Sequence, residues 1–229
     1  MTFHPPDRAG RAGFDAGHEY LLPLAPGLLR RKAVFDKTLA LLMLPFLLPL
    51  GLLITCALLL TDGAPVFYGQ WRVGRGGRRF RCWKFRSMVR DADAALDAAL
   101  AADPGLRQQW ELQRKLDIDP RIHPLGNLLR RTSLDELPQI WNVLIGDMSF
   151  VGPRPVVEEE LVYYGPYLPD YLAVRPGLTG AWQVSGRSNT TYDERVALDV
   201  DYVRGMSIQR DIKIVLATVK VVLLQTGAR

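Results

Sequence analysis

The chain has 229 residues, which is enough for one good-sized core or for a domain with an appendage. Its 29 basic residues exceed its 24 acidic ones, so the formal net charge is +5 and an anionic partner is expected: a nucleic acid, a phospholipid or a phosphorylated substrate. The two cysteines and three histidines are too few and too scattered for a disulfide framework, a zinc site or a histidine-based triad.

The N-terminal third contains an arm and an apolar segment. Residues 1–29 are rich in Pro, Gly and Ala, and we expect a disordered N-terminal arm. Residues 38–61 carry no charge and are long enough to enter a bilayer, which takes about 20 residues to cross. Pro45 and Pro49 interrupt this run, and basic residues flank both of its ends, which favours two cytoplasmic ends. A bent helix that enters and leaves one leaflet satisfies both observations, and a kinked spanning helix is the alternative.

A hairpin and several helices are expected after the apolar run. Strands are predicted at 65–73 and 79–88, joined by a glycine-rich turn at 74–77. The second strand mixes cations with aromatic side chains, as in a phosphate-facing or headgroup-facing ribbon, although a solvated hairpin face would read the same way. Asp103 and Pro104 are a typical N-cap and first residue of a helix. Helices are predicted at 92–102, 104–115, 125–131, 155–164, 193–204 and 208–225.

An adjacent acidic pair, Asp135 and Glu136, lies in the segment SLDELPQ. An ionised carboxylate pair can hold Mg²⁺ or attack phosphorus. Two interpretations are open from these residues alone. Ser133 and Glu136 have the spacing of a capping box, which would be purely structural. Alternatively, a helix N-terminus holds down the pKa of Asp135 and keeps this carboxylate anionic for catalysis.

Arginines flank the acidic pair on both sides. Arg154 stands between two prolines in the segment GDMSFVGPRP, and the following proline confines it to an extended conformation. A rigidly presented guanidinium suits a phosphate, although a connecting loop would also explain the pattern. Arg130 and Arg131 end the short helix before the pair. They would reach a phosphate held by Asp135, or would pair with that carboxylate.

Five segments occur in an order and spacing that resemble the bacterial sugar transferases. They are KFRSM at 84–88, SLDELPQ at 133–139, GDMSFVGPRP at 146–155, the loop at 175–186, and ALDVDY at 197–202. These proteins are the monotopic phosphoglycosyl transferases that begin exopolysaccharide and O-antigen assembly. The resemblance covers about residue 30 to the C-terminus. It implies an α+β fold at the cytoplasmic face of the bacterial inner membrane: a re-entrant membrane helix at 30–62, broken at Leu48 and Pro49, and a small, mostly helical catalytic domain at 63–229 with a β-hairpin.

The resemblance also implies a reaction. Hexose 1-phosphate, galactose in preference to glucose, would pass from a UDP-sugar to undecaprenyl phosphate with release of UMP. Asp135 would be the nucleophile and would also meet Mg²⁺, and Glu136 would assist as a base or by orientation. The implied substrate-binding residues are the cations Lys84, Arg86, Arg130 and Arg154. Membrane lipids are implied partners, and the resemblance allows for a homodimer.

Two features place the chain within this group, and two rival functions remain. No run of spanning helices precedes the catalytic part, so the chain resembles the short form. The insertion at about 91–122 resembles members that transfer hexose 1-phosphate. The first rival is a non-catalytic membrane-associated scaffold whose cations bind anionic lipid. The second, a nucleic-acid binder, is disfavoured because the basic residues are dispersed and no nucleic-acid module is recognised.

Overall fold

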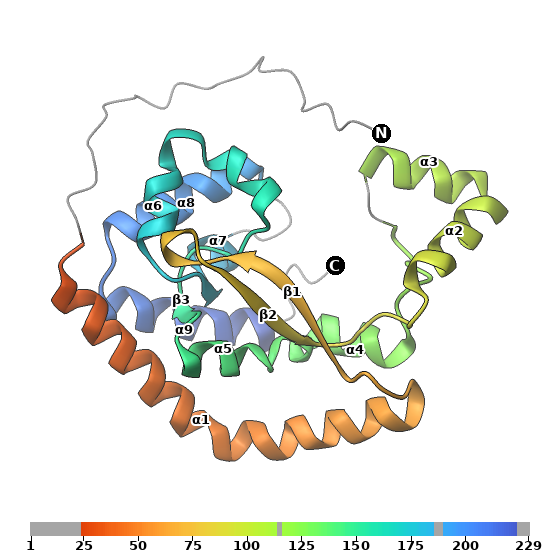
Figure 1. Ribbon diagram of the computed structural model, residues 1–229, viewed down its shortest axis with the longest axis horizontal. Helices are drawn as coiled ribbons and strands as arrows, with labels where there is room; N and C mark the ends of the chain where they lie inside the picture. The colour runs from red at the N-terminus through yellow and green to blue at the C-terminus, as the bar shows by residue number, and fades with distance from the viewer. Residues whose placement is uncertain (1–23, 114–115, 186–189, 224–229) are drawn as a thin grey trace.

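The described part of the chain is mostly helical and contains two small sheets (Figure 1). The computed structural model describes residues 24–113, 116–185 and 190–223, so most of the expected N-terminal arm lies outside the described residues. The elements are α1 (Pro26–Thr61), β1 (Phe67–Val73), η1 (Arg75–Gly77), β2 (Arg79–Phe85), α2 (Ala92–Ala102), α3 (Pro104–Gln113), α4 (Pro124–Thr132), η2 (Leu134–Glu136), α5 (Gln139–Ile145), β3 (Ser149–Val151), η3 (Glu158–Tyr167), α6 (Leu168–Ala173), β4 (Gly177–Thr179), α7 (Ala181–Ser185), α8 (Tyr192–Arg204) and α9 (Ile208–Leu223).

Helix α1 is long, apolar and bent near its middle, and it runs along one edge of the molecule (Figure 1). Pro26 starts the helix, because the fixed φ angle of proline suits the first helical position. The helix therefore begins before the predicted residue 30, and residues 26–29 belong to it rather than to the arm. Pro45 and Pro49 lie inside the helix, and proline is a known cause of such bends. The predicted bend is confirmed.

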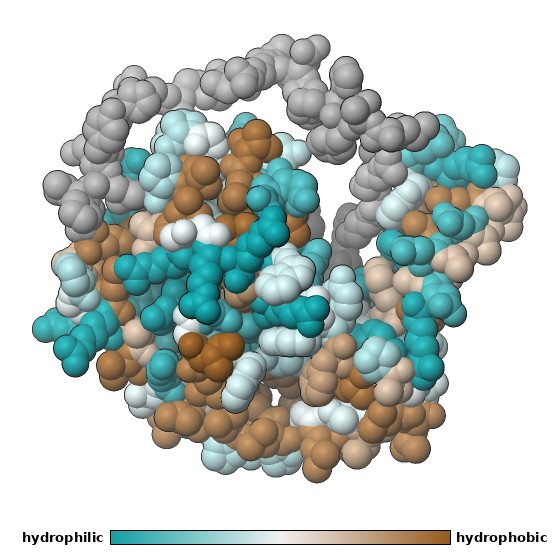
Figure 2. Space-filling model, viewed as in Figure 1, coloured by the Kyte–Doolittle hydropathy of each residue, from teal (hydrophilic) through white to brown (hydrophobic). Residues whose placement is uncertain are grey.

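The apolar surface of α1 is largely uncovered by the rest of the chain. An 18-residue window of the helix is apolar enough to cross a membrane, and only 11% of that window is buried. Phe46 is 78% exposed and Leu48 is 64% exposed. Figure 2 shows the result as a brown band along this edge of the molecule. Such a large exposed apolar surface marks a contact with a membrane or with another protein.

Strands β1 and β2 form the predicted antiparallel hairpin, with Phe67 paired to Phe85 and Val73 to Arg79. The turn at η1 contains two glycines with positive φ, Gly76 at 66° and Gly77 at 79°, which glycine adopts without strain. Both strands are shorter than predicted. Continuing the register would place Pro65 in the ladder, and a proline has no N–H to donate to a partner strand.

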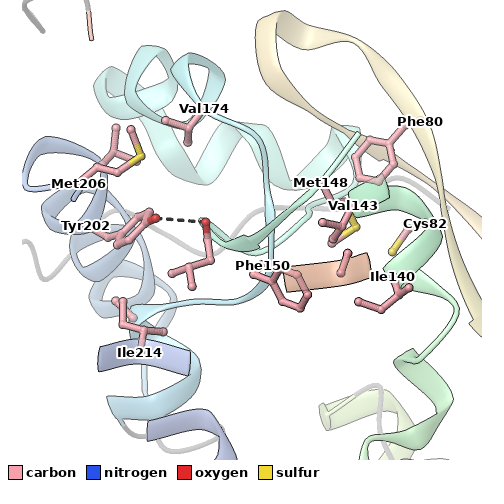
Figure 3. Packing of buried hydrophobic residues seen from close by; sticks show 14 residues of the cluster. Phe80, Cys82, Ile140, Val143, Met148, Phe150, Val174, Tyr202, Met206 and Ile214 are labelled. Atoms are coloured by element: carbon pink, nitrogen blue, oxygen red, sulfur yellow. Dashed lines mark hydrogen bonds between the residues drawn. The ribbon is translucent and has the colours of Figure 1, made fainter. Parts of the chain in front are cut away.

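A two-stranded parallel sheet lies at the centre of the core. Ser149 of β3 pairs with Gly177 of β4, and the two backbones approach so closely that a Cβ at Gly177 would lie 2.1 Å from the nitrogen of Gly152. Buried side chains from α1, β2, α5, α8 and α9 surround β3 (Figure 3). This packing fixes the end of β3. The chain continues from there into Pro153, Arg154 and Pro155, the Pro-Arg-Pro segment.

Most predicted helices are confirmed, and two segments differ. Helix α3 begins at Pro104, and Asp103 caps it by accepting hydrogen bonds from the N–H groups of Gly105 (2.7 Å) and Leu106 (3.3 Å). The predicted helix at 155–164 is instead the 3₁₀ segment η3. It begins only at Glu158, because Val156 pairs with Val73 and holds the preceding residues extended. The predicted loop at 175–186 contains β4 and α7, as far as the structure describes it.

Candidate active site

The capping-box interpretation of Ser133 is wrong. Ser133 ends α4 in the left-handed conformation, with φ of 57°, and its side chain makes no capping hydrogen bond. Its N–H donates to the carbonyl oxygen of Arg130 at 3.2 Å. The left-handed residue ends the helix, and the next residues form the short 3₁₀ turn η2. Asp135 and Glu136 lie on this turn beside β2.

We expect Ser133→Ala to change the free energy of unfolding by less than about 0.5 kcal/mol, because no cap is lost. A capping serine would cost about 0.5–2 kcal/mol on the same substitution. The control is Thr191→Ala, which removes a true capping box: the Thr191 hydroxyl accepts from the N–H of Glu194 at 3.3 Å, and the Glu194 carboxylate accepts from the N–H of Thr191 at 2.7 Å. Denaturant unfolding in detergent micelles measures the free energy of unfolding of both variants. Equal losses of stability would contradict the conclusion that Ser133 does not cap a helix.

One ammonium group joins the two carboxylates of the acidic pair. Lys84 projects from β2, and its Nζ donates to Oε1 of Glu136 at 2.5 Å. The same Nζ lies 3.7 Å from Oδ2 of Asp135. The lysine was predicted at the site, and the structure brings it together with both acids. Its charge offsets the repulsion between two adjacent carboxylates.

Asp135 is buried, with 7% of its surface exposed. Burial raises the pKa of Asp135 above its ordinary value, and the negative charge of Glu136 adds to this, while Lys84 and Arg130 oppose it. The expectation that a helix N-terminus holds this pKa down is therefore wrong. The turn η2 has only three residues, so its dipole is too small to offset the burial of the carboxylate.

An open cleft lies beside the acidic pair, between the hairpin and the Pro-Arg-Pro segment. Its cationic walls come from Lys84, Arg72 and Arg154, and Glu136 lies at its edge. The other lining residues are Gln70, Cys82, Gln139, Pro155, Gly177, Leu178 and Gln183. A cleft with three cations on its walls is suited to an anionic ligand carrying several charges.

Sequence reasoning missed Arg72 as a lining residue. The guanidinium donates to the carbonyl oxygen of Pro155 at 3.2 Å and lies 3.6 Å from the carboxylate of Glu160. Burial lowers the pKa of Arg72, and the neighbouring charge of Arg154 lowers it further. The hairpin register holds a signal that would have found it: Arg72 pairs with Phe80, which lies on the same face of β2 as Lys84.

Arg154 projects from the segment between β3 and η3, where its guanidinium lies 5.7 Å from the ring centre of Trp182. The backbone around it is fixed, because Gly177 N–H donates to the carbonyl oxygen of Pro153 at 2.8 Å. Arg154 itself is exposed. The predicted rigid presentation of this arginine agrees with these contacts.

Asp199, in the segment ALDVDY, is a buried acid near Arg154. Its Oδ2 accepts a hydrogen bond from the Tyr164 hydroxyl at 2.9 Å. Burial raises the pKa of Asp199 to about 7, while Tyr164 and the backbone N–H and charge of Arg154 oppose this rise. Asp199 therefore lies behind the Pro-Arg-Pro segment, where it supports the arginine rather than facing the cleft.

The two remaining predicted cations have partners within the protein. Arg130 donates from Nε to the Ser87 hydroxyl at 2.8 Å, close enough to Asp135 to influence its pKa. Arg86 is buried and forms an ion pair with Asp62, and it also donates to the carbonyl oxygen of Gly63 at 2.8 Å. Arg86 thus ties the end of α1 to the end of β2, whereas Arg130 remains beside the acidic pair.

Comparison with known proteins gives a family. The family model for bacterial sugar transferases matches residues 28–225. The chain is 47% identical over 197 residues to the UDP-galactose-lipid carrier transferase of Erwinia amylovora, covering 86% of this chain and 41% of that protein. It is 52% identical over 167 residues to the undecaprenyl-phosphate galactose phosphotransferase of Salmonella typhimurium, covering 73% of this chain and 35% of that protein.

A third relative matches almost end to end. The chain is 42% identical over 214 residues to the exopolysaccharide production protein ExoY of Sinorhizobium fredii, covering 91% of this chain and 95% of that protein. The chain therefore spans well under half of the Erwinia and Salmonella proteins and nearly all of the Sinorhizobium one. Together with the match to the family model, these relatives show that the chain belongs to the bacterial sugar transferase family.

Proposed function

We propose that this chain transfers a hexose 1-phosphate from a UDP-sugar to undecaprenyl phosphate, with release of UMP, as the first membrane step of exopolysaccharide or O-antigen synthesis. The observation that carries the proposal is the buried Asp135, which lies beside Lys84; Lys84 and Glu136 in turn line a cationic cleft. Galactose is the first candidate sugar, because two of the relatives are named for galactose transfer. Glucose is the second candidate, because a Xanthomonas campestris relative that is 41% identical over 206 residues is named for the transfer of glucose 1-phosphate.

The proposed reaction has two displacements at the β-phosphorus of the donor. In the first, a carboxylate oxygen of Asp135 bonds to phosphorus, and the bond from phosphorus to the bridging oxygen breaks, so that UMP leaves with the electron pair. In the second, a phosphate oxygen of undecaprenyl phosphate bonds to the same phosphorus. The bond between Asp135 and phosphorus then breaks and the carboxylate is restored. Both steps are forms of nucleophilic phosphoryl transfer, which depends on positioning and charge neutralisation.

The residues around the cleft would supply the required charge. Arg154 and Arg72 would bind the diphosphate of the donor, since a guanidinium donates two parallel hydrogen bonds to phosphate oxygens. Lys84 would neutralise charge at the reacting phosphoryl group, and Glu136 would keep Lys84 in place through their 2.5 Å contact. Arg130 would contribute positive charge behind Asp135.

Mg²⁺ is the proposed cofactor. Among the described residues no group of three or more His, Cys, Asp or Glu side chains is arranged to hold a metal ion. Mg²⁺ nevertheless fits the acidic pair, because this ion is commonly held by one or two carboxylates together with substrate phosphates. Asp135 would hold it, with Glu136 beside it, and the bound ion would neutralise negative charge on the diphosphate.

Replacing Lys84 by methionine should move the acid limb of the pH–rate profile to higher pH. Asp135 must be ionised to attack, so activity is lost as pH falls through its pKa, which burial already raises above the ordinary value. Lys84 lowers this pKa, and removing Lys84 raises it further. The measurement is the pH dependence of single-turnover UMP release. Arg79→Gln, on the exposed part of the same strand, is the control, and an unmoved limb in Lys84→Met would contradict the assignment.

We also propose that α1 is a re-entrant membrane helix, with its bend at Leu48 and Pro49 in one leaflet and the rest of the chain on the cytoplasmic face of the inner membrane. The bend and the uncovered apolar surface support this proposal. A lipid acceptor would then meet the cleft at headgroup level. A homodimer stays a prediction.

The re-entrant topology predicts that both ends of α1 face the cytoplasm. Single cysteines at Arg30 in α1 and at Arg78 in the exposed hairpin turn that follows it, in a background lacking Cys56 and Cys82, should both be shielded from an impermeant thiol reagent added outside intact cells. Permeabilised cells provide the control, since both positions should then be labelled. Labelling of one end only in intact cells would show that the helix spans the membrane.

Release of UMP from a panel of UDP-sugars, with undecaprenyl phosphate and Mg²⁺, tests the proposed function and identifies the sugar. We expect release with UDP-galactose or UDP-glucose and formation of a lipid-linked sugar diphosphate. A membrane scaffold that binds anionic lipid would release no UMP with any donor. That outcome would reject the proposal and leave the scaffold as the better account of the cationic surface.

A further inference from the structure

A buried ion pair joins α1 to the C-terminal helices. Lys32 of α1 is 5% exposed, and its Nζ donates to Oδ2 of Asp211 in α9 at 2.6 Å. Asp211 is completely buried, and its other oxygen accepts a hydrogen bond of 2.6 Å from the Tyr202 hydroxyl in α8. The N-terminal helix α1 therefore meets the two consecutive C-terminal helices, α8 and α9, at one carboxylate.

The same contact reaches the strand that leads to the Pro-Arg-Pro segment. The Tyr202 hydroxyl also lies 3.1 Å from the carbonyl oxygen of Val151 in β3, the contact drawn as a dashed line in Figure 3. One turn after Lys32, the buried Asp36 accepts a hydrogen bond of 3.2 Å from the N–H of Phe150. Helix α1 is thus bonded to β3 directly through Asp36 and indirectly through Lys32.

These polar contacts fix the position of α1 along and around its axis, which apolar packing alone cannot do. Burial of apolar surface has no direction, so an apolar helix that slides or rotates on an apolar surface loses little contact. Sliding α1 by one turn, about 5.4 Å, would separate Lys32 from Asp211 and leave a buried charge without a partner. A buried ion pair gives little net stability compared with apolar side chains of similar volume, and its main effect here is to fix one position of the helix.

We propose that Lys32, Asp36, Tyr202 and Asp211 form a polar latch that positions the membrane helix against the catalytic body, and so sets the height of the active-site cleft above the membrane for the lipid acceptor. The second end of α1 is already held by the ion pair between Arg86 and Asp62. The latch residues are positioning residues, because none of them lines the cleft beside Asp135. The lipid step of this proposal rests on the proposed function.

The test separates the soluble donor from the membrane-bound acceptor. The latch variant is Lys32→Met, Asp211→Leu and Tyr202→Phe together, which replaces three of the four polar side chains by apolar ones of similar size and leaves Asp36 in place. In lipid nanodiscs we expect its first half-reaction, single-turnover UMP release without acceptor, to stay within about twofold of wild type. Its kcat/KM for undecaprenyl phosphate should fall at least tenfold. A purely structural role would instead lower the rate of UMP release and the kcat/KM for undecaprenyl phosphate in the same proportion, following the folded fraction. That result would overturn the proposal.

The control is Asp201→Asn, which weakens the ion pair between Asp201 in α8 and Arg210 in α9 at an exposed carboxylate. This variant keeps the Arg210 guanidinium over the Tyr202 ring, and it should leave both half-reactions unchanged. If the latch variant fails to fold, Tyr202→Phe alone keeps the aromatic ring and removes one hydrogen bond to Asp211. We expect a two- to fivefold loss confined to the lipid step, and no loss would count against the latch.

A distance measurement tests the latch without any catalytic readout. Spin labels at Leu42 of α1 and Glu159 of η3, in a background lacking the two native cysteines, report the position of the helix relative to the body. We expect one narrow distance distribution in the wild-type background, and a shifted or broader distribution in the latch variant. If UMP release fails while this result holds, the reaction is wrong and the latch stands. Identical distributions would reject the latch whatever the activity.

Discussion

Asp135→Asn is expected to fold like the wild type and to lose turnover by about 10⁴-fold or more, the range seen when a catalytic nucleophile is removed. The amide keeps the size of the side chain but cannot attack phosphorus. Burial already raises the pKa of Asp135, so a neutral side chain at this position costs little stability. The measurement is steady-state UMP release with undecaprenyl phosphate, together with thermal unfolding in the same detergent.

The control for this substitution is Asp97→Asn, an equal change of charge on the exposed surface of α2. It should keep wild-type activity and stability. If Asp135→Asn were well folded and turned over normally, Asp135 would not be the nucleophile. If it lost activity only because it unfolded, the thermal scan would show a lowered midpoint, and the chemical interpretation would fail.

Glu136→Gln is expected to lower turnover by about 10²- to 10⁴-fold, the range for groups that assist proton transfer or hold a catalytic residue in place. The glutamate accepts a 2.5 Å hydrogen bond from Lys84, and the neutral amide cannot hold the ammonium as strongly. Lys84 is then free to pair more closely with Asp135, 3.7 Å away, which would weaken the nucleophile. Single-turnover UMP release separates this first step from transfer to lipid.

Glu136→Gln should lower turnover without lowering stability. Its side chain is one-third exposed and forms no cap, so the unfolding midpoint should stay close to that of the wild type. Glu159→Gln, on the exposed surface of η3, is the matched control and should leave both steps unchanged. Normal single-turnover rates in Glu136→Gln would show that the second carboxylate has no part in forming the intermediate.

Local sequence signals predicted the elements whose structure is decided locally. The hairpin follows from alternating residues around two glycines, and α3 follows from Asp103 and Pro104. The capping box at Ser133 failed because the same residue types also occur at a helix end, and α4 is held against the chain just after β2, where Gly126 lies against the backbone of Ser87. No local pattern distinguishes a serine that starts a helix from one that ends it in the left-handed conformation.

The long-range contacts could not be predicted from the sequence, for a different reason. Lys32 and Asp211 are 179 positions apart, and nothing near either residue in the sequence indicates its partner. Arg86 was read as a substrate ligand from its motif, whereas burial and the Asp62 carboxylate give it a structural partner. The acidic pair and Lys84 were found correctly as neighbours because the family resemblance carries long-range information that residue patterns lack.

The most direct test of the central claim is mass spectrometry of the wild-type protein and Asp135→Asn after incubation with UDP-sugar and Mg²⁺, without lipid acceptor. We predict a hexose-phosphate adduct on the wild-type peptide that contains Asp135, and none on the variant. The adduct should disappear when undecaprenyl phosphate is added, because the lipid phosphate displaces the carboxylate. UMP release and lipid product without any adduct on Asp135, or an adduct that persists in Asp135→Asn, would contradict the account.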